Sequence, residues 1–271
     1  MSNKIFFPDI IELYITNECN LTCSDCNRYN NYNFSGHYEW RPYEQAMLAW
    51  GRRITAPTIT IIGGEPCLHP DLYGWVDLAA RAWPESKIMI QSNGTIKLPN
   101  LDAILQIAPG RTGIVASIHQ ESMRNSIKNK NNFTDGQLID NTTFNACSLI
   151  DHGSYFTVYD SDPYSAWEAC SMSVSHTILN GRLYKCPMTA VLPEFRKQYQ
   201  VNLTAEQELL LYSYRSLAHD CSQEELDAFL ERRNQEIPQC RLCPGEFITK
   251  KVTFDTSRKK RKKINSGDIN L

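Results

Sequence analysis

The stretch Ile10-Ile-Glu-Leu-Tyr-Ile-Thr16, followed by Cys19-Asn-Leu-Thr-Cys23-Ser-Asp-Cys26, decides the fold that we predict for this chain. The first part is a mostly apolar run that predicts a buried β-strand. The second part places three thiols directly after that strand. A structural zinc site takes four protein ligands, and an iron–sulfur cubane normally takes four thiolates. Three clustered cysteines therefore predict a metal centre that has a distant fourth ligand or leaves one position open.

Strand-like and helix-like segments alternate through the first half of the chain. After the first strand we expect strands at 58–62, 87–91, 113–118 and 155–159, and helices at 43–53, 71–83, 101–108 and 144–151. The polar stretch 120–135 predicts a mobile loop. This alternation predicts an α/β fold of parallel strands with right-handed crossovers. The carboxyl ends of parallel strands meet on one rim, where ligands bind, and the residues expected there are Cys19, Gly63, Asn93, His119 and Asp160.

The pattern changes beyond about residue 165. Asn180-Gly181 predicts a β-hairpin, and capping boxes at Thr204 and Ser222 predict two helices. The last stretch, from about Lys250, ends in the basic block Arg258–Lys263 and has little to bury, so we expect it to be disordered. We predict a core domain over residues 1–165, a small α+β domain over 166–249 and a basic tail over 250–271.

Composition limits the function classes. The chain has 271 residues, 42% of them hydrophobic and 21% charged, which is typical of a globular protein. Its net charge of −2 gives no global attraction to nucleic acid or to acidic membranes. No apolar run is long enough to span a membrane, and we expect a cytoplasmic protein. Ten cysteines in such a compartment predict metal or redox chemistry more than disulfides.

Two motifs together carry a family resemblance. The CxxxCxxC spacing of Cys19, Cys23 and Cys26, with Gly63-Gly-Glu-Pro66 after the second expected strand, resembles the radical S-adenosylmethionine (radical SAM) enzymes. The resemblance implies a partial (β/α) barrel of five to six parallel strands. It also implies that the three cysteines hold a [4Fe–4S] cluster whose fourth iron binds S-adenosylmethionine. The alternative for the three thiols is a zinc knuckle completed by His37 or Cys67.

The resemblance implies further contacts to S-adenosylmethionine. Gly63, Gly64 and Glu65 would hold the methionyl amine, and Pro66 would fix the turn. The polar residues at the next two strand ends resemble the positions that meet the ribose and the carboxylate, and they are Ser92, Asn93, Ser117 and His119. Turn residues and strand-end caps are the alternative reading for each. Asp25 departs from the family, which usually has an aromatic or apolar residue there, so we expect adenine contacts from Tyr29 or Tyr32.

A second set of four cysteines follows in the second half of the chain: Cys170, Cys186, Cys240 and Cys243. Their spacing resembles the twitch and SPASM extensions of radical SAM enzymes, which hold auxiliary iron–sulfur clusters. Four ligands fit one auxiliary [4Fe–4S] cluster, and zinc held by the same thiolates is the alternative. We expect the other three cysteines, Cys67, Cys147 and Cys221, to be buried as small hydrophobic side chains.

The resemblance implies an enzyme that cleaves S-adenosylmethionine reductively and uses the 5′-deoxyadenosyl radical to abstract hydrogen from a substrate. An electron donor such as flavodoxin or ferredoxin would supply the first electron. With an auxiliary cluster the net reaction can be a dehydrogenation, for which Asp160, Asp162 and Glu168 are candidate proton acceptors; capping or surface roles are the alternative.

Substrate identity is left open by the sequence. The first expected strand begins near the N-terminus, so we expect no fused peptide-binding domain before it. A small molecule, or a peptide delivered by a partner, fits that expectation. The basic tail raises nucleic acid as a further substrate class. A non-catalytic zinc or iron–sulfur interaction module is the alternative from another functional class.

Overall fold

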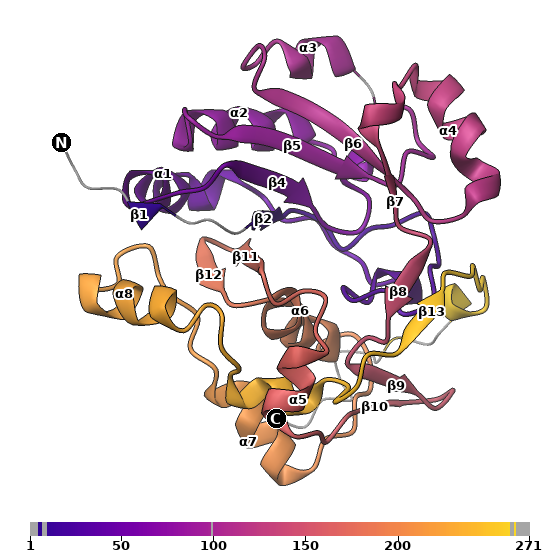
Figure 1. Cartoon of the computed structure of the whole chain (residues 1–271), viewed down its shortest axis with the longest axis vertical. Coiled ribbons are helices and arrows are strands. Elements are labelled where there is room, and N and C mark those ends of the chain that lie inside the picture. The colour runs from indigo at the N-terminus through magenta and orange to yellow at the C-terminus, as the bar shows by residue number, and fades with distance from the viewer. Residues whose placement is uncertain (1–4, 7–9, 99, 261–262, 264–271) are drawn as a thin grey trace.

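A seven-stranded sheet organises the computed structural model, which describes residues 5–6, 10–98, 100–260 and 263. The strands lie in the order β12 (Arg182–Tyr184), β11 (Ser175–Leu179), β2 (Ile10–Tyr14), β4 (Thr58–Ile62), β5 (Lys87–Ser92), β6 (Thr112–Ile118) and β7 (Leu138–Asp140). All neighbours from β11 to β7 are parallel, and β12 pairs antiparallel with β11. The prediction of an α/β fold with a mostly parallel sheet is confirmed, and the curved sheet is consistent with a partial barrel (Figure 1).

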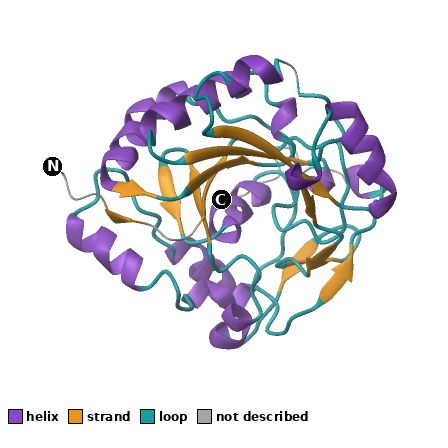
Figure 2. Ribbon diagram, turned by 45° about the horizontal axis from the view of Figure 1, so that its top comes forward, coloured by secondary structure: helices purple, strands orange, loops and turns teal. Residues whose placement is uncertain are grey.

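The crossover segments between these strands contain the helices α1 (Glu44–Arg53), α2 (Leu72–Ala82), α3 (Leu101–Leu105) and α4 (Arg124–Asn131). Figure 2 shows a row of helices along the outer face of the curved sheet. Asp71 caps α2 by accepting a hydrogen bond from the amide of Gly74 at 3.1 Å, as residues with short polar side chains do at helix starts. The short strand β1 (Ile5–Phe6) pairs with β3 (Ile54–Thr55) beside α1.

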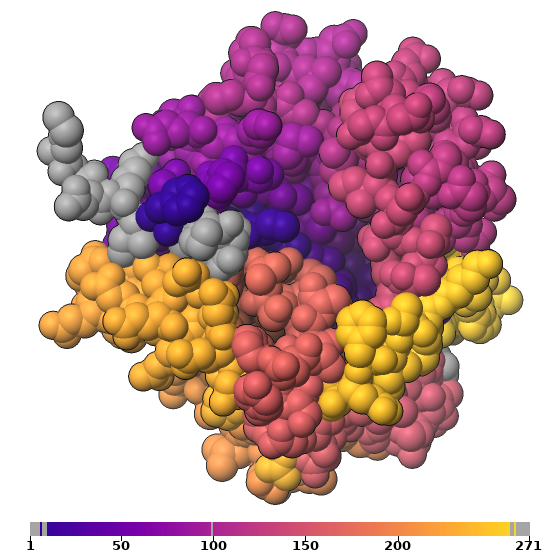
Figure 3. All heavy atoms as spheres, viewed as in Figure 1, coloured from indigo at the N-terminus to yellow at the C-terminus, as the bar shows by residue number. Residues whose placement is uncertain are grey.

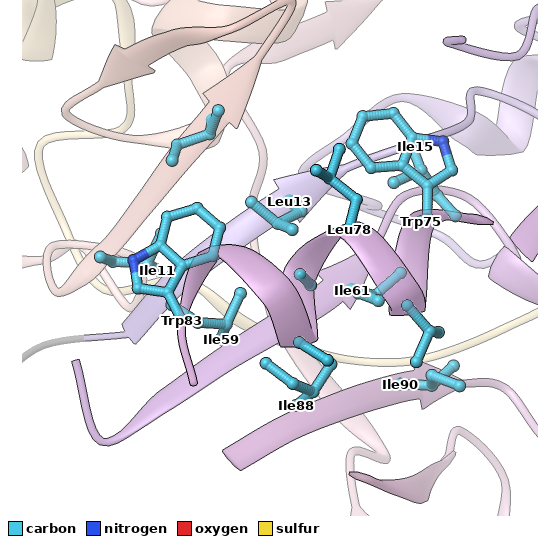
Figure 4. Packing of buried hydrophobic residues seen from close by; sticks show 14 of the residues in the cluster. Ile11, Leu13, Ile15, Ile59, Ile61, Trp75, Leu78, Trp83, Ile88 and Ile90 are labelled. Carbon is cyan, nitrogen blue, oxygen red and sulfur yellow. The ribbon is translucent and has the colours of Figure 1, made fainter. Parts of the chain in front are cut away.

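The main core lies between the sheet and these helices. Alternate residues of the strands point outward, and β-branched and aliphatic side chains such as Ile11, Leu13, Ile59 and Ile61 pack under α2. Figure 4 shows Trp75, Leu78 and Trp83 of this region against the strands. Successive side chains of a strand point to opposite faces, so the residues between these apolar positions face the concave side of the sheet. Some of those residues are polar.

Most of the remaining elements lie on the open side of the sheet, and the helix at 223–231 packs into the main core through Leu226 and Leu230. The remaining elements are β8 (Thr143–Asn145), β9 (Leu149–Asp151), β10 (Phe156–Val158), α5 (Pro163–Glu168), α6 (Pro187–Arg196), α7 (Ala205–Ser213), α8 (Gln223–Glu231) and β13 (Thr249–Lys251). A second hydrophobic cluster centres on Phe195 of α6, whose ring lies 4.5 Å from that of Tyr199 and 5.1 Å from that of Tyr29. This cluster ties the segment after Cys26 to the second half of the chain.

Local signals in the second half are confirmed where they depend on near neighbours. Asn180 and Gly181 have φ values of 50° and 71°, as a two-residue hairpin turn requires. Capping boxes begin α7 at Thr204 and α8 at Ser222. The hairpin extends the main sheet, because β11 pairs with β2. The division at residue 165 stays a prediction.

Two predictions of local structure are wrong, and a third, the strand at 155–159, is confirmed as a strand but lies outside the expected sheet. The predicted helix 144–151 is instead β8 and β9, because β8 pairs with β13 and β9 with β10. The predicted strand 155–159 is β10, which pairs antiparallel with β9 outside the main sheet. The predicted loop 120–135 contains α4, where Ile127 is buried against the core and offsets the low helix propensity of its Asn-rich sequence.

Part of the tail that we expected to be disordered is ordered. Residues 249–251 form β13, and 258–260 form a 3₁₀ turn. Residues 261–262 and 264–271 of the predicted tail lie outside the described residues. In the part of the chain that the structure describes, no helix is long and apolar enough to cross a membrane.

Candidate functional site

A cavity of about 580 Å³ lies on the concave side of the sheet. Inward-facing residues of four adjacent strands line it, namely Glu12 of β2, Thr60 of β4, Gln91 of β5 and Ser117 of β6. On the face shown in Figure 3 the surface is hollowed between the segment of β7 and β8, in pink, and the C-terminal segment, in yellow. The volume is in the range of small-molecule and cofactor sites.

The cysteine loop, residues 19–26, follows β2 and lies at the carboxyl end of the sheet. All three of its thiols line the cavity. Burial raises the pKa of the Cys19 thiol to about 12, and burial followed by the neighbouring thiols Cys26 and Cys19 raises the pKa of Cys23. These thiols are close enough to repel one another as thiolates, so a positively charged metal centre between them would stabilise the deprotonated forms.

Gly63 and Gly64 hold the cysteine loop from the next strand end. The amide of Gly64 donates to the carbonyl of Thr16 at 2.8 Å, and the amide of Glu65 donates to the carbonyl of Glu18 at 2.7 Å. A Cβ on Gly64 would lie 2.1 Å from the Glu18 carbonyl oxygen, and one on Gly63 would lie 2.4 Å from that of Thr16. The glycines therefore allow close approach of two backbone segments, in addition to lining the cavity.

The side chain of Glu65 connects the ends of β4 and β5. Its Oε1 accepts hydrogen bonds from the Ser92 hydroxyl at 2.8 Å and the Cys67 amide at 3.0 Å, and its Oε2 accepts from the Asn93 amide at 2.7 Å. Its side chain is completely buried, and neither Glu65 nor Pro66 is among the residues that line the cavity. In this structure Glu65 positions Ser92 and Asn93, and a direct contact to the methionyl amine stays a prediction.

The polar residues predicted at the third and fourth strand ends reach the cavity. Ser92, Asn93, Ser117 and His119 all line it. Asn93 donates from Nδ2 to the Asn20 side chain at 2.9 Å, which links it to the cysteine loop. His119 Nδ1 lies 3.3 Å from the carbonyl of Asn141, and because a carbonyl only accepts, Nδ1 carries the proton. Burial lowers the pKa of His119, so its Nε2 is an acceptor at neutral pH.

The second cysteine set converges on the same cavity from three segments. Cys170 follows α5, Cys186 caps α6, and Cys240 and Cys243 belong to the turn at Pro238–Leu242 and its end. Burial, then the thiols of Cys186, Cys170 and Cys240, raises the pKa of Cys243 well above its ordinary value. The four cysteines line the same cavity, as a shared cationic centre would require.

The donor sets fit an iron–sulfur group chemically. All ten cysteines are free of disulfides, and two groups of thiols face one cavity. Within the described ranges, no group of three or more His, Cys, Asp or Glu side chains is arranged to hold a single metal ion. Cys67 and Cys221 pack against the main core and Cys147 belongs to the second cluster, where it also lines the cavity.

The predicted proton acceptors lie elsewhere. Asp160 is exposed and pairs with Arg241, whose Nη2 lies 3.3 Å from Oδ2, and its pKa is lowered by that pairing. Asp162 caps α5 by accepting from the Ser165 amide at 2.9 Å, and Glu168 is exposed at the end of the same helix. None of the three lines the cavity. Asp160 was expected on the rim because β10 was assigned to the main sheet.

Two charged residues of the cavity wall were missed by the sequence reasoning. Glu12 and Arg28 form an ion pair with 2.6 Å between Oε2 and Nη2, and their side chains are only 5% and 10% exposed. The available signal was Glu12 itself, a carboxylate within an otherwise apolar strand. Asp25 also lines the cavity, where it has a left-handed φ of 54° and lies 3.3 Å from Lys250 Nζ.

Comparisons with known proteins assign no family. No protein-family model matches the sequence, and no curated protein matches it. A solved structure of BtrN in complex with AdoMet and 2-DOIA has 13% identity and a TM-score of 0.46, covering 87% of this chain and 92% of that one. BtrN in an open conformation has 15% identity and a TM-score of 0.39, covering 68% and 71%. Streptococcus suis SuiB bound to S-adenosylmethionine has 16% identity and a TM-score of 0.35, covering 46% and 28%. At these TM-scores the backbones superpose only in part.

Proposed function

We propose that this protein is a radical S-adenosylmethionine enzyme with one auxiliary iron–sulfur cluster. The observation that carries the proposal is the convergence of Cys19, Cys23 and Cys26, the Gly63-Gly64 turn and the polar ends of β5 and β6 on one cavity. When bound, the cluster and S-adenosylmethionine supply reductive cleavage to a 5′-deoxyadenosyl radical, which abstracts hydrogen from the substrate. An external one-electron donor, such as flavodoxin or ferredoxin, belongs to the proposal.

The chain's own residues hold and orient these groups. The cysteine loop provides three thiolates, Glu65 fixes Ser92 and Asn93 beside it, and the four cysteines of the second set hold the auxiliary cluster. Enclosure by β8, β13 and the segment after α5 limits access of water, which protects a reactive species.

For an oxidation, His119 is the group that we propose as proton acceptor. It lines the cavity, its Nδ1 proton is held by Asn141, and its lowered pKa leaves Nε2 unprotonated at neutral pH. It replaces the exposed carboxylates that the sequence indicated. The cavity volume favours a small substrate, or one side chain of a larger one, after the cofactors have taken their share.

The test uses anaerobically purified protein with S-adenosylmethionine and a strong reductant. We expect 5′-deoxyadenosine from the wild type and none from the Cys19→Ala/Cys23→Ala/Cys26→Ala variant. Cys221→Ala is the matched control, since Cys221 packs beside Arg53, outside the cavity lining. Protein with an intact cluster that forms no 5′-deoxyadenosine would show that the proposal is wrong and would favour a non-catalytic metal-binding module.

The auxiliary cluster has a separate test. Cys170→Ala and Cys240→Ala should each lower the iron content of the protein by about one [4Fe–4S] equivalent and remove the corresponding visible absorption. Zinc bound in a stoichiometric amount, lost in the same variants while iron stays constant, would assign the second set to zinc instead.

A further inference from the structure

The C-terminal segment 249–260, here called the strap, runs along the cysteine loop. Cys23 and Phe254 form an antiparallel β-bridge, in which the Ser24 amide donates to the Thr253 carbonyl at 2.8 Å, and the Thr253 amide donates to the Ser24 hydroxyl at 3.0 Å. The Asp255 amide also donates to the carbonyl of Thr22 at 3.4 Å. Figure 1 shows the beginning of the strap, β13, beside β8. The strap thus contacts the peptide between the predicted iron ligands.

Packing anchors the strap at both ends. Val252 is buried, with 2% of its surface exposed, and Lys250 Nζ lies 3.3 Å from Asp25 Oδ1. The guanidinium of Arg258 lies 5.7 Å from the centre of the Tyr32 ring, within the range of a cation–π contact. Lys263, just beyond the strap, donates to the hydroxyl of Ser35. Several side chains of the basic block therefore make contacts within the protein.

Lys259 makes the contact nearest to the thiols. Its Nζ donates a 2.7 Å hydrogen bond to the backbone carbonyl of Cys19, and the side chain is half-buried. This contact places the ammonium group against the backbone of the first predicted iron ligand. A charge-assisted hydrogen bond of this kind is stronger than a neutral one.

The second cysteine set has a comparable arrangement. Lys185 is buried, with 5% of its surface exposed, and its Nζ donates to the carbonyls of Arg232 and Arg233. Lys185 is the residue directly before Cys186 in the chain. A lysine whose ammonium group is held by backbone carbonyls thus lies beside each cysteine set. Because the arrangement occurs twice, it is not the accidental position of one flexible side chain.

We propose that Lys259 is a positioning residue that holds the cysteine loop in its metal-binding conformation and places a fixed positive charge beside the metal centre. The inference rests on the proposed function for the identity of that centre. A centre with three thiolate ligands becomes more negative on reduction, and a nearby fixed cation stabilises the more negative form. The strap therefore serves both retention of the metal and its reducibility.

The test compares Lys259→Met with Lys260→Met and Lys259→Arg in the full-length chain. Lys260 is the exposed neighbour in the same basic block and is the matched control. The first readout is the rate at which a chelator removes iron from the first centre. That centre is identified by the kinetic phase that is absent in the Cys19→Ala/Cys23→Ala/Cys26→Ala variant. We expect about tenfold faster loss for Lys259→Met, on the order expected for one hydrogen bond to a charged group. Lys260→Met should match the wild type, and Lys259→Arg should lose iron at a rate between those of the wild type and Lys259→Met.

The second readout is the reduction potential of the same centre, which should be more negative in Lys259→Met and close to the wild type in Lys260→Met. The third is amide hydrogen exchange of residues 19–26 in metal-free protein, which should be faster in Lys259→Met alone. Unchanged exchange in the main core would exclude general unfolding as the cause.

Equal behaviour of Lys259→Met and Lys260→Met in all three readouts would overturn the inference. The exchange measurement needs no metal, so it reports on the strap even if the cysteine loop turns out to hold no iron. Faster exchange in protein that never acquires iron would retain the loop contact and reject the proposed function. If Lys259→Met binds iron normally and its hydrogen exchange, iron release and reduction potential equal those of the wild type, the role of Lys259 is rejected and the proposed function is retained.

Discussion

The backbone amide of Asn93 donates a 2.7 Å hydrogen bond to Oε2 of Glu65, joining two strand ends that are consecutive in the sheet. This contact makes a buried carboxylate the organiser of the polar end of β5, since Oε1 of the same group accepts from Ser92. The ligand-facing geometry of the cavity therefore depends on a side chain that does not itself line it.

Glu65→Gln should weaken this arrangement. The NH₂ of the glutamine replaces one carboxylate oxygen and faces hydrogen-bond donors, so at least one buried donor loses its acceptor. We expect this loss to lower the unfolding free energy by about 1–3 kcal/mol. Binding of S-adenosylmethionine to reconstituted protein should weaken at least tenfold. Chemical denaturation and calorimetric titration measure the two effects. Glu121→Gln, a change at an exposed ion pair, should have neither effect.

Gly64→Ala should displace the cysteine loop. The added methyl would lie 2.1 Å from the backbone carbonyl oxygen of Glu18, and because the methyl is fixed to Cα and cannot rotate away, the strain is relieved only by moving the loop. We expect a loss of about 1–3 kcal/mol in stability, as for other overpacked sites, together with loss of iron from the first centre. Gly136→Ala is the control, because a Cβ there meets no atom within 4 Å. Full iron retention in Gly64→Ala would contradict the prediction.

The buried pair of Glu12 and Arg28 predicts a strongly non-additive double mutant. Arg28→Met leaves an uncompensated carboxylate and should destabilise the protein by about 3–5 kcal/mol. The double variant Glu12→Leu/Arg28→Met removes both charges and should recover most of that loss. A double-mutant cycle from urea unfolding measures the difference. Additive single effects would mean that the two groups do not interact in solution.

His69 predicts a fall of stability in mild acid. Its Nδ1 accepts from the Asp71 amide at 3.0 Å and its Nε2 lies 3.0 Å from the Tyr38 carbonyl, which fixes the neutral tautomer. Burial lowers its pKa from 6.5, so between that value and the lower folded-state pKa the unfolded chain binds the extra proton. The contribution of His69 to the unfolding free energy is constant above pH 6.5 and declines as the pH falls below it.

The measurement is the slope of unfolding free energy against pH below neutrality. His69→Gln can present an amide oxygen and an NH₂ at corresponding places without titrating, so its slope should be smaller than that of the wild type. An identical slope in His69→Gln would show that protonation of His69 is not coupled to unfolding.

Prediction from sequence was accurate where residues close in the chain determine the structure. The strands over 10–14, 58–62, 87–92 and 112–118 follow from β-branched runs that end in turn residues. The Asn180-Gly181 hairpin and the capping boxes follow from the backbone preferences of single residues. It failed for the predicted helix 144–151, where β8 pairs with β13, a strand more than a hundred residues away, and β9 pairs with β10 in a local hairpin that lies outside the main sheet.

For the candidate site, the sequence identified the thiols and the strand-end residues, since carboxyl ends of parallel strands meet at one edge of the sheet. It could not place Asp160, whose distance from the cavity depends on β10 leaving the main sheet. It could not find His119 as an acceptor either, because the protonated nitrogen is defined by a contact to Asn141.

The sequence by itself therefore determined the α/β class of the protein and the group of thiols after its first strand, because strand periodicity and cysteine spacing are local properties. Only the tertiary structure decided that both cysteine sets face one cavity, that Glu65 lies behind its wall and that the basic segment lies on the cysteine loop. These facts depend on contacts between residues far apart in the chain, and such contacts form only when the sheet, the second cluster and the strap pack together.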